Sequence, residues 1–157
     1  MTTILRAELK DAEAVLAIQK QAFEAEARLI QNWDIPPMAE TLESVLEQIR
    51  DAHVLKAVDG HRIAGSIRGI LNGTVCGIHR LSVDQDFRGK GIGSALLLAI
   101  EQAHPDASAF ELVTNGAMEE NVRFYIWHGY HVQARVRHSE SITLVHMAKQ
   151  MVMAAPA

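Results

Sequence analysis

The most informative part of the chain is Leu81-Ser82-Val83-Asp84-Gln85-Asp86-Phe87-Arg88-Gly89-Lys90-Gly91-Ile92-Gly93-Ser94. The pattern is typical of a strand that runs into a glycine-rich turn and opens a helix. The alternating glycines allow positive φ and let a ligand approach the backbone closely. The first N–H groups of the helix lack partners, and its positive dipole end points to the same place. The segment therefore predicts an anion site, most naturally for a pyrophosphate, to which Arg88 and Lys90 add charged contacts.

Two other phosphate motifs fail on this segment. A dinucleotide fingerprint, G-x-G-x-x-G, ends on Ser94 when it starts at Gly89, and on Leu96 when it starts at Gly91. A Walker A loop fails because no Gly-x-x-x-x-Gly-Lys-Ser/Thr occurs. The pattern Arg88-x-x-Gly91-x-Gly93 remains. Its plain alternative is a tight turn with a glycine N-cap and no ligand.

Length and composition predict one domain over residues 1–157. The chain has 157 residues, of which 48% are hydrophobic, and its formal net charge is -4. That charge argues against a general nucleic-acid binder, which would carry a basic footprint. No apolar run approaches the roughly 18 residues of a membrane span, and the N-terminus has no signal-peptide layout. One cysteine and eight histidines show no zinc-like spacing. We therefore expect a cytoplasmic protein with no metal, membrane or nucleic-acid partner.

Outward from the glycine-rich segment, the pattern predicts alternating strands and helices. Asp59-Gly60 and Asn72-Gly73 are strong hairpin signals and predict a three-stranded antiparallel meander. The order β-α-α-β-β-β-α-β-α-β-β fits an α/β (α+β) fold, with a mixed, mostly antiparallel sheet of about six to seven strands and helices on both faces. The predicted strands are Ile4 to Leu9, Val54 to Val58, Arg62 to Leu71, Val75 to Val83, Phe110 to Thr114, Tyr130 to Arg137 and Ile142 to Met147. The predicted helices start at about Asp11 and Met38 and span Ile92 to Ala103 and Glu119 to His128.

Two motifs resemble one known family. The run from Leu81 to Leu97 resembles the acetyl-CoA-binding motif of GCN5-related N-acetyltransferases (GNAT), whose hallmark is Gln/Arg-x-x-Gly-x-Gly/Ala after the fourth strand. Phe124-Tyr125-Ile126-Trp127-His128-Gly129-Tyr130 resembles that family's aromatic-Tyr-x-x-x-Gly-Phe/Tyr. The order of predicted elements is also that of the family, so the resemblance extends over nearly the whole chain.

The resemblance implies a binding mode for acetyl-CoA as cosubstrate. Backbone groups around Leu81, Ser82 and Val83 would hold the pantetheine arm as an added strand. The N–H groups from Arg88 to Ser94, which include those of Gly89, Lys90, Gly91, Ile92 and Gly93, would hold the pyrophosphate. In the family the fourth and fifth strands separate, so the thioester would lie between Ile78–Val83 and Phe110–Thr114.

Tyr125 matches the family's tyrosine that protonates the departing thiolate. A phenol with a pKa near 10 can donate a proton to that leaving group. The alternative is a helix aromatic packed in the core. Asn121 lies one helical turn before Tyr125, where its amide could reach the cofactor arm or the widened strand; the alternative is a surface or capping role.

The general base is not fixed by the sequence. Some family members use a glutamate on the fourth strand, but Val75 to Val83 contains no carboxylate. His79, with an ordinary pKa near 6.5, and Glu111 on the next strand are the candidates. The alternatives are a structural histidine, a surface glutamate, and a proton relay through water.

The resemblance implies an acetyl-CoA-dependent N-acetyltransferase. A primary amine of a small molecule or peptide would attack the thioester directly in a ternary complex, and Cys76 would be a core residue and not an acyl carrier. The rival function is a non-catalytic acyl-CoA-binding or sensing module.

The distribution of charge gives a further indication about the acceptor. Residues 1–51 hold ten acids against five bases. Most of this acidic excess lies in the acidic segment between Phe23 and Ile49. The acids of this segment are either solvated helix faces or a lip that attracts a cationic amine. The alternating final strands also offer an edge for pairing in a homodimer.

Overall fold

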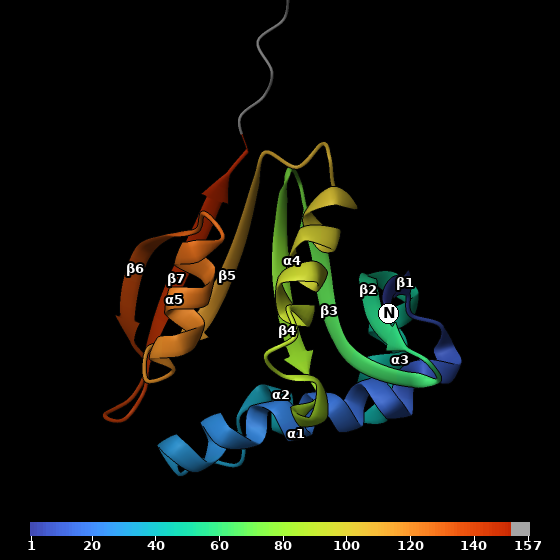
Figure 1. The fold of residues 1–157 in the computed structure, drawn as a ribbon. Coiled ribbons are helices and arrows are strands. Elements are labelled where there is room, and N and C mark those ends of the chain that lie inside the picture. The colour runs from blue at the N-terminus through green and yellow to red at the C-terminus, as the bar shows by residue number, and fades with distance from the viewer. Residues whose placement is uncertain (152–157) are drawn as a thin grey trace, which may run out of the picture.

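The computed structural model describes residues 1–151 and contains one seven-stranded sheet with the strand order β1-β2-β3-β4-β5-β7-β6 (Figure 1). All neighbouring strands pair antiparallel except β4 and β5, which are parallel. The strands are β1 (Thr2–Arg6), β2 (His53–Asp59), β3 (Arg62–Asn72), β4 (Val75–Val83), β5 (Ala109–Asn115), β6 (His131–Arg137) and β7 (Thr143–Gln150). The helices are α1 (Ala12–Ile30), α2 (Pro36–Ala39), α3 (Leu42–Asp51), α4 (Ile92–Gln102) and α5 (Glu119–Trp127).

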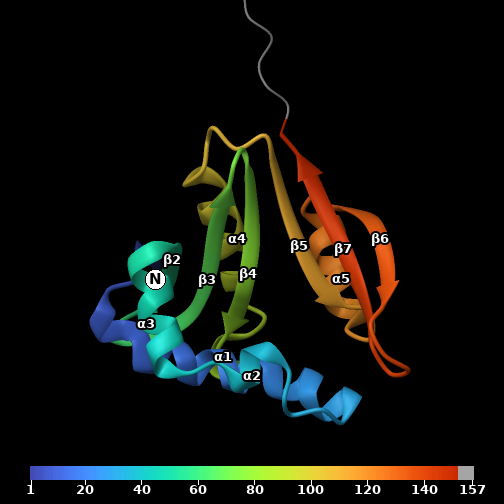
Figure 2. The same cartoon turned by 180° about the vertical axis from the view of Figure 1, so that it is seen from behind.

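Helices lie on both faces of the sheet, as the sequence predicts. Figure 1 shows α4 and α5 in front of the sheet, and Figure 2, from behind, shows α3 and α2 on the opposite side. Helix α1 crosses below the C-terminal end of β4 in both views. Together with the strand pairing, this arrangement confirms the expected mixed, mostly antiparallel sheet with helices on both faces.

Two predicted elements near the N-terminus are wrong in extent. The first strand ends at Arg6 and not at Leu9, because Leu9–Asp11 forms a 3-10 turn. The single helix expected from Met38 is two helices, because Glu40 and Thr41 have extended backbone angles. The Thr41 side chain then caps α3 by accepting a hydrogen bond of 3.2 Å from the Ser44 N–H.

The sheet divides between β4 and β5. These two strands pair only where Val75, Cys76 and Gly77 face Ala109–Glu111, and beyond that point the ribbons diverge (Figure 1). The main buried core lies around this division, with Ile67, Leu96, Ile100 and Phe110 at 0% exposure. The short ladder and this core hold the two halves of the sheet together.

A buried hydrogen-bond network also links the halves. Tyr130 is fully buried, and its hydroxyl donates to Glu101 Oε2 on α4 over 2.7 Å. Lys149 Nζ on β7 donates to both oxygens of the same carboxylate, at 3.1 and 3.3 Å. Burial and the Glu101 carboxylate raise the pKa of Tyr130, so its phenol stays a donor.

We predict that Tyr130→Phe lowers the free energy of unfolding by about 1–3 kcal/mol, because a buried carboxylate oxygen loses a donor. Chemical denaturation measures this change. Tyr125→Phe is the matched control, since in residues 1–151 no hydrogen bond involves the Tyr125 hydroxyl. Equal stabilities of the two variants would contradict the role of the network.

Candidate active site

The glycine-rich loop after β4 has the geometry of an anion-binding helix start. Gly89 and Gly91 have φ of +75° and +80°, and Gly91 is the N-cap of α4. A Cβ on either glycine would meet no atom within 4 Å, so this side of the loop is open. Because Gly91 carries no capping side chain, the first N–H groups of α4 can bind an anion.

The loop also presents free positive charge. Within residues 1–151, Arg88 and Lys90 form no ion pair and both are exposed. Lys90 Nζ lies 5.4 Å from the ring centroid of the buried Phe87. Arg62 stacks on the same ring at 4.9 Å, but its charge is offset by Asp84 and Asp86. Arg88 and Lys90 are therefore the side chains that can contact a phosphate.

The last third of β4 forms an unpaired strand edge that leads into this loop. Ser82 and Val83 pair with β3, while the pairing of β4 with β5 has already ended at Gly77. Leu81 and Val83 pack against the main core. The backbone groups that face away from β3 have no partner strand here, so an extended ligand can pair with them as an added strand.

Tyr125 lies on α5 and packs against the main core. Its ring makes edge contacts with Phe124 and Tyr130, at centroid distances of 5.2 and 5.8 Å. Burial raises the pKa of Tyr125, so the phenol keeps its proton at neutral pH. Asn121 is half-buried one turn earlier on the same helix, and its backbone N–H donates to Met118 over 3.0 Å.

A contact between α4 and α5 connects the loop to Tyr125. Ser94 Oγ and His128 Nε2 are 2.9 Å apart. A Cβ on Gly93 would lie 3.6 Å from the Phe124 ring, so α5 packs closely on the first turn of α4. His128 lies within the second quoted motif but was not among the predicted site residues. This contact fixes the end of α5 against the anion-binding loop.

The two predicted base candidates lie near the point where β4 and β5 separate. Glu111 is exposed and faces Gly77, the last residue of β4 that pairs with β5. The His79 ring lies against Gly77, where an added Cβ would be 2.8 Å from Nε2. His79 is exposed on one side, but partial desolvation of its ring lowers its pKa, and the charges of Arg80 and Arg68 lower it further, so His79 is neutral at pH 7. No hydrogen bond or ion pair in residues 1–151 joins His79 to Glu111.

A buried charge cluster, which the sequence analysis missed, lies beside His79 on the side of α1 and α2. Glu40, which is 6% exposed, accepts two hydrogen bonds from Arg68, at 3.1 and 3.2 Å, and one from Arg80 Nε at 3.3 Å. Gln19 and Ser44 also donate to this carboxylate, at 2.9 and 2.7 Å. One acid of the predicted acidic lip is thus fully used inside the protein.

Arg80 itself has an unusual backbone. Its φ is +57°, in the left-handed region that only a few per cent of non-glycine residues occupy. The β3–β4 register shifts at this point, since Ser66 pairs with Ser82 but Arg68 pairs with His79. Arg80 is therefore the extra residue of a bulge, and its side chain is turned toward Glu40.

Glu26 is a further residue that sequence reasoning missed as a site candidate. It is half-buried on α1, and burial raises the pKa of its carboxyl group. Glu26 follows Gln19 by two helical turns and so shares its face of α1, the face that contacts Glu40. Its position in the acidic segment was the one available signal.

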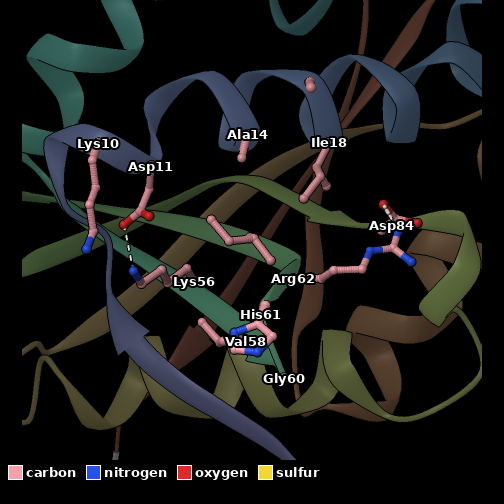
Figure 3. Close-up of a pocket in the computed structure, with 12 residues that line it drawn as sticks. Lys10, Asp11, Ala14, Ile18, Lys56, Val58, Gly60, His61, Arg62 and Asp84 are labelled. Atoms are coloured by element: carbon pink, nitrogen blue, oxygen red, sulfur yellow. Dashed lines mark hydrogen bonds and ion pairs between the residues drawn. The ribbon is translucent and has the colours of Figure 1, made fainter.

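A separate pocket of about 590 Å³ lies between α1 and the β2–β3 hairpin (Figure 3). Its lining includes the buried ion pair between Lys56 Nζ and Asp11 Oδ2, at 2.7 Å. Arg62 and Asp84 lie at its far end in the same view. None of the predicted site residues lines this pocket, so the candidate active site lies elsewhere.

Cys76 is fully buried in the main core, and burial raises the pKa of its thiol. Such a thiol is a poor nucleophile, in agreement with the predicted core role. In residues 1–151, no three His, Cys, Asp or Glu side chains are grouped as metal ligands would be. The helices of that part of the chain are also too short or too polar to cross a membrane.

Residues 17–151 match the family described as the acetyltransferase (GNAT) domain. The chain belongs to this family. The resemblance of the two sequence motifs is thereby confirmed at the level of the family. No sequence among the curated proteins matches the chain significantly.

Solved GNAT structures share the fold at low sequence identity. The ribosomal-protein-S18-alanine N-acetyltransferase of Escherichia coli is 16% identical with a TM-score of 0.81, over 99% of this chain and 97% of that one. The PaiA N-acetyltransferase of Thermoplasma acidophilum, solved with coenzyme A, is 18% identical with a TM-score of 0.80, over 96% and 99%. YncA of Salmonella typhimurium, solved with acetyl-CoA, is 17% identical with a TM-score of 0.77, over 100% and 98%.

The Glu40 cluster predicts a specific pH dependence of stability. Hydrogen bonds from Arg68, Ser44 and Gln19 outweigh burial and lower the pKa of Glu40 to about 2. A lowered folded-state pKa adds stability above the ordinary value of 4.5, and this stability is lost as pH falls toward 2. As the pH falls through this window, we expect the free energy of unfolding of wild type to decrease on the order of 2–3 kcal/mol more than that of Glu40→Gln.

Denaturant unfolding at pH values across this window measures the difference between the two proteins. Glu43→Gln, which removes an exposed carboxylate of α3, is the control and should parallel wild type. If the free energy of unfolding of Glu40→Gln also follows that of wild type across these pH values, the Glu40 carboxylate is not stabilised by hydrogen bonds from the arginines.

Proposed function

We propose that this GNAT protein transfers an acetyl group from acetyl-CoA to a primary amine of a small molecule or peptide. The observation that carries this proposal is the separation of β4 from β5 immediately before the open glycine loop. The unpaired edge can hold an extended arm, and the loop at its end can hold a pyrophosphate. The structures of PaiA with coenzyme A and of YncA with acetyl-CoA support the choice of cosubstrate.

In this proposal the backbone of Leu81, Ser82 and Val83 binds the pantetheine arm. The N–H groups from Arg88 to Ser94 bind the pyrophosphate, with Arg88 and Lys90 as charged partners. Asn121, half-buried on the first turn of α5, offers its side-chain amide to the same arm. Arg88, Lys90 and Asn121 contribute side chains, so single substitutions can test these three contacts.

The proposed chemistry is direct attack in a ternary complex. The amine nitrogen forms a bond to the thioester carbonyl carbon, the carbon–sulfur bond breaks, and the thiolate takes a proton from the Tyr125 hydroxyl. The amine gives its proton to His79, which its lowered pKa keeps neutral, or to Glu111, directly or through water. The S18-alanine enzyme acts on an alanine of a ribosomal protein, which supports a peptide amine as one acceptor class here.

A non-catalytic acyl-CoA-binding or sensing module is the second candidate. The absence of a hydrogen bond between His79 and Glu111 in residues 1–151 favours it, because no orienting partner holds the candidate base. Release of free thiol that depends on an added amine separates the two functions. A broad panel of amines and peptides that releases none would favour the module.

We predict that Tyr125→Phe lowers kcat by about 100-fold, because the leaving thiolate loses its proton donor. The affinity for coenzyme A and the free energy of unfolding should change little. Steady-state kinetics with a good acceptor measure kcat, and titration calorimetry measures the affinity. Turnover at the wild-type rate would remove Tyr125 from the mechanism.

We predict that Gly91→Glu abolishes coenzyme A binding. The new side chain fills the open side of the loop, adds a negative charge, and strains a backbone with φ of +80°. Gly73→Glu is the matched control, since Gly73 also has positive φ and open surroundings but lies in the β3–β4 turn. Undiminished affinity in Gly91→Glu, or equal loss in both variants, would contradict the assignment of the loop.

A further inference from the structure

We propose that Arg80 binds a carboxylate carried by the acceptor, so that the acceptor is an amine with a nearby carboxylate. The carboxylate belongs either to a free α-amino acid or to the acidic first side chain of a peptide. This inference rests on the proposed transfer reaction and names its substrate class. It differs from the cationic acceptor that is one of the two interpretations of the acidic segment.

Arg80 lies on the stretch of β4 that has separated from β5. It follows Gly77, the last residue paired with β5, by three positions and directly precedes Leu81. Leu81 packs into the core between the sheet and α4, whereas the Arg80 side chain extends to Glu40 beside α2. An acceptor that enters from the side of α1 and α2 therefore meets Arg80 before it reaches the open edge of β4.

The charge balance leaves Arg80 free to bind an anion. Both Nη groups of Arg68 are bonded to Glu40, so this buried pair is already neutral. Arg80 adds one uncompensated positive charge and uses only its Nε. Its Nη groups donate to no acceptor within residues 1–151, and its side chain is 24% exposed. A planar fork of free N–H donors matches a carboxylate in bidentate geometry.

Two unpartnered atoms in the same cluster also point to a ligand. In the described part of the chain, Gln19 Oε1 and Arg68 Nε are the buried side-chain atoms without a hydrogen-bond partner. Gln19 is 1% exposed and Arg68 is 5% exposed. Buried polar atoms are nearly always bonded, so this cluster has capacity for an added polar group. No other region of residues 1–151 combines such atoms with a free guanidinium.

The backbone of Arg80 favours a functional role as well. A left-handed backbone is sterically unfavourable for an arginine on a strand, and such strained residues gather at binding sites. The Ser82 hydroxyl donates to the Arg80 carbonyl over 3.1 Å and helps to hold this geometry. The strain places the guanidinium on the α2 side while Leu81 keeps its place in the core.

The positive field also suits the chemistry. Arg80 and Arg68 add to the lowering of the His79 pKa, so their charge reaches the proposed base. The same field lowers the pKa of an acceptor ammonium bound nearby and so favours the free amine that attacks. A carboxylate on the acceptor orients the amine, and the amine still attacks in its free, unprotonated form.

The test compares matched acceptors that differ only in the carboxylate. L-amino acids are assayed against their carboxamides, and short peptides that begin with Asp against those that begin with Asn. We expect wild type to favour one of the acids over its amide by about tenfold or more in kcat/KM, mainly through KM. Arg80→Gln should remove most of this preference, and Arg80→Lys should keep part of it.

Two further variants separate binding from folding. Arg80→Asn also removes the guanidinium, and asparagine tolerates the left-handed backbone. Arg50→Gln removes an exposed arginine of α3 and should leave the preference unchanged. Thermal unfolding and coenzyme A affinity show that each variant remains folded. Two results would overturn the inference: a preference for acids that survives in both Arg80→Gln and Arg80→Asn, or equal kcat/KM with acids and amides in wild type. Neither result would contradict the proposed acetyl transfer.

A binding measurement tests the inference without turnover. N-acetyl-L-amino acids and their amides are titrated into the protein, with and without coenzyme A. Tighter binding of the acids than of the amides, lost in Arg80→Gln, supports the inference even if no acceptor is acetylated. The lack of acetylation would then count only against the proposed transfer reaction. Equal binding of acids and amides would overturn it.

Discussion

Beyond Gly77, β4 and β5 share no hydrogen bonds, and the candidate site depends on this separation. Strands usually satisfy their backbone groups against a neighbour, so an edge in the middle of a sheet has to be held open. Here a three-residue ladder, the core around Phe110 and the buried Glu101 network join the two halves on one side of the division. The contact of Ser94 with His128 joins α4 to α5 beside the glycine loop. Between these attachments, the edge of β4 stays accessible to an extended ligand.

Much of the fold could be predicted from the sequence because its signals are local. The turns at Asp59-Gly60 and Asn72-Gly73 specify the meander, and both glycines have positive φ. The loop at Gly91 could likewise be predicted, since a glycine N-cap and free N–H groups are properties of a few consecutive residues. The family followed from the same local motifs, and the match of residues 17–151 confirms it.

The remaining features depend on contacts between distant residues. Glu40 bonds to arginines 28 and 40 positions away, so a count of charges along the chain could not show that it is neutralised. Those bonds also favour the extended backbone at Glu40 that divides the expected helix into α2 and α3. The left-handed conformation of Arg80 lies at a bulge in the β3–β4 pairing, and the partial burial of Glu26 depends on the fold around α1. The amino-acid composition therefore does not show which charges are available to bind an acceptor.

The central claim is that the unpaired edge of β4 and the glycine loop together bind acetyl-CoA. The most direct measurement is a titration with acetyl-CoA followed by amide nitrogen–proton NMR. The account predicts large shifts of the amide signals of Leu81, Val83 and the run Gly89–Ser94, with smaller shifts elsewhere. Shifts confined to the pocket of Figure 3, around His61 and Lys56, would contradict it, as would the absence of any shift at saturating acetyl-CoA.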